Sequence, residues 1–170
     1  MKSGRPYAAA LLAAAAFAVG AWLAFQGTGT DQKLPDVGYM RLDGTHGTTG
    51  AMRGRVTLIN FWATDCTTCA HEMPQLAAAY ERFKARGYDT LAVAMSYDNP
   101  ADVRSYATAR GLPFPVAHDA DGRMSRSFGN VETTPTSVLV NKRGDIVMRY
   151  VGEPDFVALG RLVDRLLAES

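Results

Sequence analysis

The hydrophobic positions of this 170-residue chain fall into three kinds of pattern. Residues 7–25 form an uncharged, apolar run whose length is close to the roughly 20 residues that cross a bilayer. Further along, a near-continuous β-branched and aromatic run at 56–62 indicates a strand that is buried on both faces, and residues 89–95 indicate a second buried strand. Between these runs, apolar residues at 66–86 recur at helical spacing. The pattern predicts an apolar N-terminal segment followed by a domain of alternating strands and helices.

The second half of the domain continues this alternation and ends in a hairpin and a helix. Asn99 is expected to cap a helix that begins at Pro100, and Gly111 is expected to end it. Further strands and a closing amphipathic helix are predicted at 113–119, 136–141, 145–151 and 156–167. The expected fold class is therefore α/β, with a central mixed β-sheet flanked by helices.

The apolar N-terminal run is expected to be an uncleaved membrane anchor. Lys2 and Arg5 precede it, which favours a cytoplasmic amino terminus with the rest of the chain outside. Trp22 and Phe25 extend the run past its best cleavage positions, although a cleaved signal peptide remains the alternative. The predicted organisation is an anchor at 1–25, a polar linker at 26–36 and one domain at 37–170.

Charge changes this picture only by excluding one class of function. The chain has 18 Lys and Arg against 17 Asp and Glu, and no long basic block. This balance argues against a nucleic-acid-binding protein. The hydrophobic share of 47% is that of a globular protein.

The chain has two cysteines, Cys66 and Cys69, at the point where a buried strand gives way to a helix. Residues three apart in a first helical turn lie on one side and can meet the separation of a disulfide. Cys66 would sit at the helix amino end, where free amides favour a thiolate, and Cys69 would be less exposed. A loop this short adds little as a structural staple. We therefore expect Cys66 to attack a disulfide and Cys69 to resolve the intermediate.

A metal site at the cysteines is the competing interpretation. Zinc needs four ligands, and the pair supplies two. His46, His71 and His118 are scattered along the chain, so neither a metal nor a cofactor is predicted. Two thiolates can still hold Cu(I), and a copper-binding chaperone therefore remains open.

The stretch "NFWATDCTTCAHEMP" resembles the active-site strand and helix of thioredoxin-fold proteins, and most closely the TlpA-like, membrane-anchored disulfide reductases of the bacterial envelope. The likeness continues through "RGRVTLINFWAT", "LPFPVAHDADG" and "TTPTSVLVNKRGDIV", and it covers residues 34–168. It implies a periplasmic catalytic domain on a single-pass inner-membrane anchor, or a soluble periplasmic form if the anchor is cleaved. Protein disulfides would be the substrates, and a membrane carrier of thiols would be the electron donor. A dithiol oxidase is the alternative.

The resemblance also assigns roles to residues around the cysteines. Pro135, which taken alone reads as an ordinary strand-start proline, would be the family's cis-proline, and the Thr134 backbone would pair with the substrate chain. Trp62 would be the aromatic residue beneath the site. Asn60 stands where thioredoxin has a buried acid, so Asp98 is a possible proton acceptor, with capping of a turn as its competing role.

Asp65 departs from the family pattern, which usually has tryptophan directly before the first cysteine. An aspartate there is expected to cap the following helix. Its charge also opposes a second negative charge on Cys66 and should raise the pKa of that thiol. The substitution leaves the dithiol chemistry in place and bears on the substrate and the redox potential.

Overall fold

The computed structural model describes residues 32–169, and the predicted anchor lies outside them. Within 32–169, no helix combines the length and the apolar character needed to span a bilayer. Gln32 to Asp36, the end of the predicted linker, already contact the domain. The backbones of Lys33 and Asp145 form an isolated antiparallel β-bridge, and the Leu34 amide donates to the Gly144 carbonyl at 2.8 Å.

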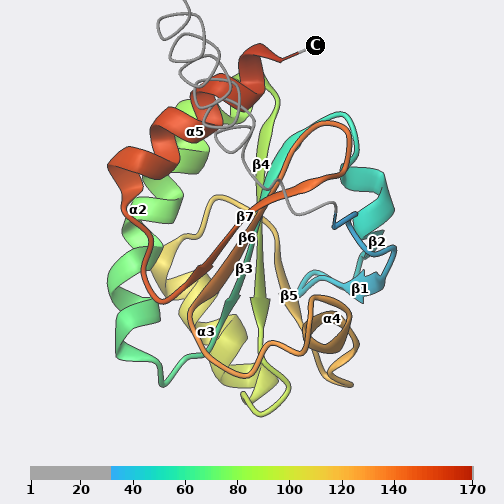
Figure 1. The fold of residues 1–170 in the computed structure, drawn as a ribbon. Coiled ribbons are helices and arrows are strands. Elements are labelled where there is room, and N and C mark those ends of the chain that lie inside the picture. The colour runs from blue at the N-terminus through green and yellow to red at the C-terminus, as the bar shows by residue number, and fades with distance from the viewer. Residues whose placement is uncertain (1–31, 170) are drawn as a thin grey trace, which may run out of the picture. The chain divides into compact units, whose positions relative to one another are not determined.

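A five-stranded mixed sheet forms the centre of the domain, in the order β5-β4-β3-β6-β7 (Figure 1). Its strands are β3 (Val56–Trp62), β4 (Tyr88–Ala94), β5 (Val116–His118), β6 (Thr136–Val140) and β7 (Ile146–Val151). Strand β3 pairs in parallel with β4 and antiparallel with β6. All of its residues are buried, as its continuous apolar run predicts.

Two hydrophobic clusters cover the two faces of the sheet. One lies under α2 (Thr67–Phe83), α3 (Pro100–Arg110) and α5 (Phe156–Ala168). The other lies under η1 (Thr49–Met52), α4 (Arg123–Ser127) and the hairpin of β1 (Gly38–Met40) and β2 (His46–Thr48). A short turn, η2 (Lys84–Arg86), follows α2. The expected α/β architecture with flanking helices is therefore observed.

Local signals set the ends of the helices. The Asn99 side chain accepts a hydrogen bond from the Ala101 amide at 2.9 Å, and Pro100 occupies the first turn of α3. Gly111 ends the helix with a φ of 55°, a left-handed conformation that glycine adopts without steric cost. These boundaries confirm the helix that the sequence predicts.

Candidate active site

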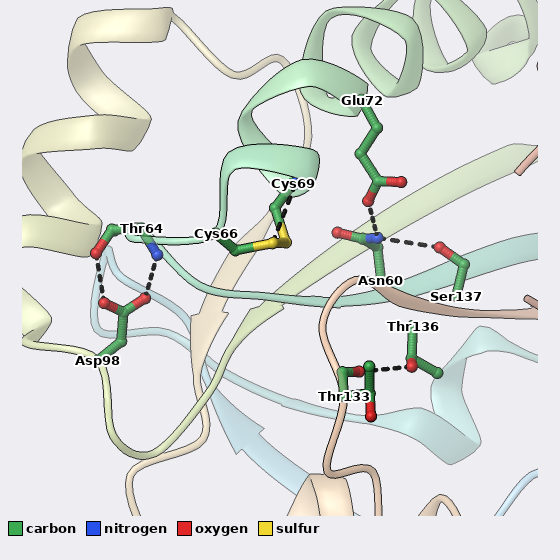
Figure 2. The surroundings of a disulfide bond; sticks show 9 residues. All are labelled: Asn60, Thr64, Cys66, Cys69, Glu72, Asp98, Thr133, Thr136 and Ser137. Atoms are coloured by element: carbon green, nitrogen blue, oxygen red, sulfur yellow. Dashed lines mark hydrogen bonds between the residues drawn. A yellow bond between two sulfur atoms is a disulfide. The ribbon is translucent and has the colours of Figure 1, made fainter. Parts of the chain in front are cut away.

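The two cysteines form a disulfide at the start of α2 (Figure 2). Their Cα atoms are 5.2 Å apart, as expected for a pair spaced by one helical turn. Cys66 is the N-cap residue of the helix, and its Sγ accepts a hydrogen bond from the Cys69 amide at 3.1 Å. A helix amide directed at Sγ stabilises a thiolate there once the pair is reduced.

The two cysteines differ in their access to solvent. Cys69 is fully buried, whereas Cys66 is partly exposed. Trp62, at the end of β3, is also fully buried, and its ring centroid lies 5.0 Å from that of Tyr106 on α3. A partner protein can therefore reach Cys66 more easily than Cys69.

The loop before β6 carries the proline that the sequence singles out. The bond between Thr134 and Pro135 is cis, and the Pro135 carbonyl accepts from the Gly152 amide at 2.8 Å. Thr136, which follows, is aligned with Phe61 of β3. Because Phe61 and Trp62 lead into the segment that carries Cys66, this alignment brings the proline loop to the cysteine end of the sheet.

Asp98 follows β4 and faces the segment just before the cysteines. Its two carboxylate oxygens accept hydrogen bonds from the Thr64 amide, at 2.7 Å, and from the Thr64 hydroxyl (Figure 2). A ring nitrogen of His118 lies 3.1 Å from the Asp98 carbonyl oxygen. These contacts hold the turn in front of Cys66, while a proton-acceptor role for Asp98 stays a prediction.

Asp65 does not have the capping role that its position suggests. The residue directly before the first helical residue, Thr67, is Cys66, so Sγ of Cys66 occupies the place of the capping acceptor. Asp65 is exposed and makes no hydrogen bond or ion pair within the described part of the chain. The prediction of a helix cap was therefore wrong by one residue, and what remains is the charge beside the thiol.

The structure adds a residue that sequence reasoning missed, the buried acid Glu72. Its carboxylate is fully buried between α2 and the sheet, and Oε1 accepts from Asn60 Nδ2 at 2.7 Å (Figure 2). Asn60 Nδ2 also donates to Ser137 Oγ at 3.0 Å. Glu72 Oε2 has no partner in residues 32–169. A signal existed in the sequence, since an acid three residues after Cys69 falls within the apolar stripe of the helix.

Burial changes the acidity of Glu72. Loss of hydration raises the pKa of its carboxyl from 4.5 to about 7, the hydrogen bond from Asn60 acts in the opposite direction, and the nearby charge of Glu153 adds to the rise. Glu153 lies between β7 and α5, and two residues of α2 hold it. His71 Nδ1 lies 3.0 Å from its carboxylate, and Gln75 Nε2 donates to it. A carboxyl with a pKa near neutrality can exchange a proton in the pH range where thiols react.

Known proteins have sequences similar to part of this chain. A family model described as Redoxin matches residues 30–158. The thiol-disulfide oxidoreductase ResA of Bacillus anthracis is 33% identical over 102 residues, which cover 60% of this chain and 58% of the relative. The ResA of Bacillus subtilis is 32% identical over 101 residues, or 59% of this chain and 55% of the relative. The chain thus matches less than two thirds of the length of these relatives.

Solved structures show the same fold. A candidate thioredoxin from Neisseria meningitidis has a TM-score of 0.76 and 39% identity, covering 82% of this chain and 93% of that one. A thiol:disulfide interchange protein of the thioredoxin family from Chlorobium tepidum has a TM-score of 0.74 at 23% identity, covering 83% and 99%. These matches confirm the thioredoxin-like α/β fold with a central mixed sheet.

Proposed function

Because the chain belongs to the Redoxin family, we propose that it is a thiol–disulfide oxidoreductase that reduces disulfides in proteins of the bacterial cell envelope. The observation that carries the proposal is the Cys66–Cys69 disulfide at the start of α2, with Cys66 partly exposed and Cys69 buried. The substrates would be disulfide-bonded proteins involved in cytochrome c maturation or in the assembly of copper sites.

The reaction begins with the reduced pair. The Cys66 thiolate, stabilised by the helix amides, attacks one sulfur of a substrate disulfide and forms a mixed disulfide, while the other substrate sulfur leaves as a thiolate. Cys69 then loses its proton and attacks Cys66 Sγ. The second substrate sulfur leaves, the protein pair is oxidised to the disulfide, and the substrate has gained two electrons.

Glu72 is our proposed acceptor for the Cys69 proton. It lies one helical turn after Cys69 on the buried side of α2, and its Oε2 has no partner within residues 32–169. With a pKa of about 7, the carboxyl is ionised often enough to accept a proton near neutral pH and protonated often enough to return it. Asp98, whose oxygens are both bound to Thr64, is the second candidate.

The location and the electron supply are further parts of this proposal. The basic residues before the apolar run 7–25 support an inner-membrane anchor with the catalytic domain in the periplasm. A disulfide between the two cysteines suits an oxidising compartment. Each turnover leaves the pair oxidised, so a membrane protein that carries thiols would have to reduce it again.

Trapping of the intermediate tests the assignment. Cys69→Ser should accumulate mixed disulfides with partner proteins, visible as bands on non-reducing gels that disappear with dithiothreitol, because the resolving thiol is missing. Cys66→Ser is the matched control and should trap none. Equal trapping by both variants, or trapping by Cys66→Ser alone, would contradict the division of roles.

The direction of transfer needs a separate measurement. The pre-reduced protein should reduce a disulfide-bonded model peptide faster than the oxidised protein oxidises the same peptide in its dithiol form. The reverse order of rates would identify a dithiol oxidase. Both reactions can be followed by separating the two forms of the peptide by chromatography.

A further inference from the structure

A groove beside the proline loop combines a cationic side chain with an exposed apolar one. It encloses about 400 Å³ and runs between the segment 129–133 and the end of β7. Thr133, Thr136, Arg149 and Val151 are among the residues that line it. Val151 is 69% exposed, so the outer wall of the groove is an accessible apolar surface.

Arg149 is a cation without a counter-ion in this groove. It stands on β7 opposite Val138, on the side of the sheet that α4 covers, and its Nη2 donates to the Phe128 carbonyl. Within residues 32–169 its side chain forms no ion pair and no other hydrogen bond. A guanidinium carries five N–H donors in a planar fork that matches a carboxylate. Most of these donors are left for a partner from outside.

The acid in the groove does not neutralise Arg149. Glu132 is exposed, and its Oε1 accepts a hydrogen bond from Asn130 Nδ2 at 2.6 Å. It forms no ion pair with Arg149, which is half-buried. A half-buried charge is screened less by solvent than an exposed one. The groove therefore offers an acidic group a cationic inner wall.

The groove is continuous with the loop that would hold the substrate chain. Thr133 and Thr136 stand on either side of Thr134 and Pro135, and the Thr136 hydroxyl donates to the Thr133 carbonyl at 2.7 Å. An extended chain advances about 3.3 Å per residue. A substrate segment that meets the proline loop with its cysteine at Cys66 therefore passes the groove within a few residues.

We propose that this groove binds an acidic side chain of the substrate protein, placed within about three residues of the cysteine that reacts with Cys66. Arg149 pairs with the carboxylate, and Val151 contacts the neighbouring part of the chain. This inference rests on the proposed function, since it names the class of disulfide that the protein prefers. The reaction itself is unchanged, because the pairing orients the substrate and forms no covalent bond.

Two disulfide-bonded peptides provide the test, one with glutamate and the other with glutamine at every position within about three residues of the reacting cysteine. The pre-reduced full chain, kept in a mild detergent, should reduce the glutamate peptide about tenfold faster, as expected for one charge-assisted pair. Arg149→Gln should bring the ratio of the two rates close to one. Arg161→Gln, which removes an exposed arginine of α5 on the opposite face of the sheet from α4, should keep the wild-type ratio.

Thermal unfolding, a conservative variant and added salt distinguish loss of the charge pair from loss of folding. Arg149 also donates to the Phe128 carbonyl, so thermal unfolding of each variant is measured first. Arg149→Lys keeps the charge and should retain part of the preference. In the wild-type protein, the preference should shrink as salt is raised to about 0.5 M, because salt screens the pair.

The outcomes separate the two proposals. Equal wild-type rates for the two peptides, a preference that survives in Arg149→Gln, or a preference insensitive to salt would overturn the groove assignment. Bis(2-hydroxyethyl) disulfide, an uncharged small probe, tests the dithiol chemistry alone. If the wild-type protein reduced neither this probe nor either peptide, the proposed function itself would fail.

Discussion

Replacing Glu72 with glutamine should remove a pH dependence of stability that the oxidised protein carries. The side chain is fully buried, and its pKa is raised from 4.5 to about 7, chiefly by the loss of hydration. The folded state therefore holds a proton on Glu72 over a pH range in which the unfolded chain has released it. The resulting stability is fully present below about pH 4.5 and is lost as pH rises through about 7.

The size of the effect follows from the difference between the pKa values of Glu72 in the unfolded and folded states. Each pH unit between the unfolded and folded pKa values corresponds to about 1.4 kcal/mol, so the interval from 4.5 to about 7 gives an upper limit between about 3 and 4 kcal/mol. Glutamine has almost the same shape, and its carbonyl oxygen still accepts the hydrogen bond from Asn60. At pH 8 the Glu72→Gln variant should therefore be more stable than the wild type by up to about 3 to 4 kcal/mol, and near pH 4.5 the two should be similar.

Urea unfolding of the oxidised full chain in a mild detergent, at several pH values between 4.5 and 8.5, measures this difference. Glu81→Gln is the matched control, because Glu81 is an exposed acid on the same helix. Its difference from the wild type should not follow the same pH course. A constant difference between wild type and Glu72→Gln over the whole range would refute the raised pKa and, with it, the role of Glu72 as a proton acceptor near neutrality.

Three other perturbations address the neighbouring groups. Asp65→Asn should leave the unfolding free energy unchanged, because the Asp65 side chain makes no hydrogen bond within the described part of the chain. The variant should lower the pKa of the Cys66 thiol in an ultraviolet thiolate titration and make the redox potential less negative. A pKa that does not fall would contradict the electrostatic argument. Asp98→Asn should cost about 1–2 kcal/mol in urea unfolding, because one of the two bonds to Thr64 loses its acceptor. If the unfolding free energy did not change and Cys69 attacked the mixed disulfide more slowly at each pH measured, Asp98 would instead be favoured as the proton acceptor. In cell fractionation the mature chain should retain residues 1–25 and sediment with membranes, whereas a soluble form that starts near residue 26 would identify a cleaved signal peptide.

Much of the fold is contained in patterns that act over short distances along the chain. The continuous apolar run of β3 identifies a strand buried on both faces, and Asn99 and Gly111 mark the ends of α3 through local backbone geometry. The spacing of Cys66 and Cys69 places two sulfurs on one side of a helical turn whatever the rest of the chain does. These features could be predicted because their causes lie within a few residues.

The features that tune the site depend on residues far apart in sequence. Glu72 acquires its raised pKa because α2 packs it against the sheet, beside Asn60 and Ser137, and the hydration it loses is invisible in the sequence. The capping of α2 by Cys66 instead of Asp65 depends on where the helix begins, which local signals locate only to within a residue or two.

By itself, the sequence determined the order of strands and helices, the position of the redox pair and the residue that carries its exposed sulfur. Only the tertiary structure decided which polar and charged groups lie near the redox pair and the proline loop, and in what environment. It joined Asp98 to Thr64, buried Glu72 and left Arg149, beside the proline loop, without a counter-ion among residues 32–169. The physical reason is that burial and charge pairing arise from contacts between distant segments, whereas helix starts and buried strands arise from the local spacing of side chains.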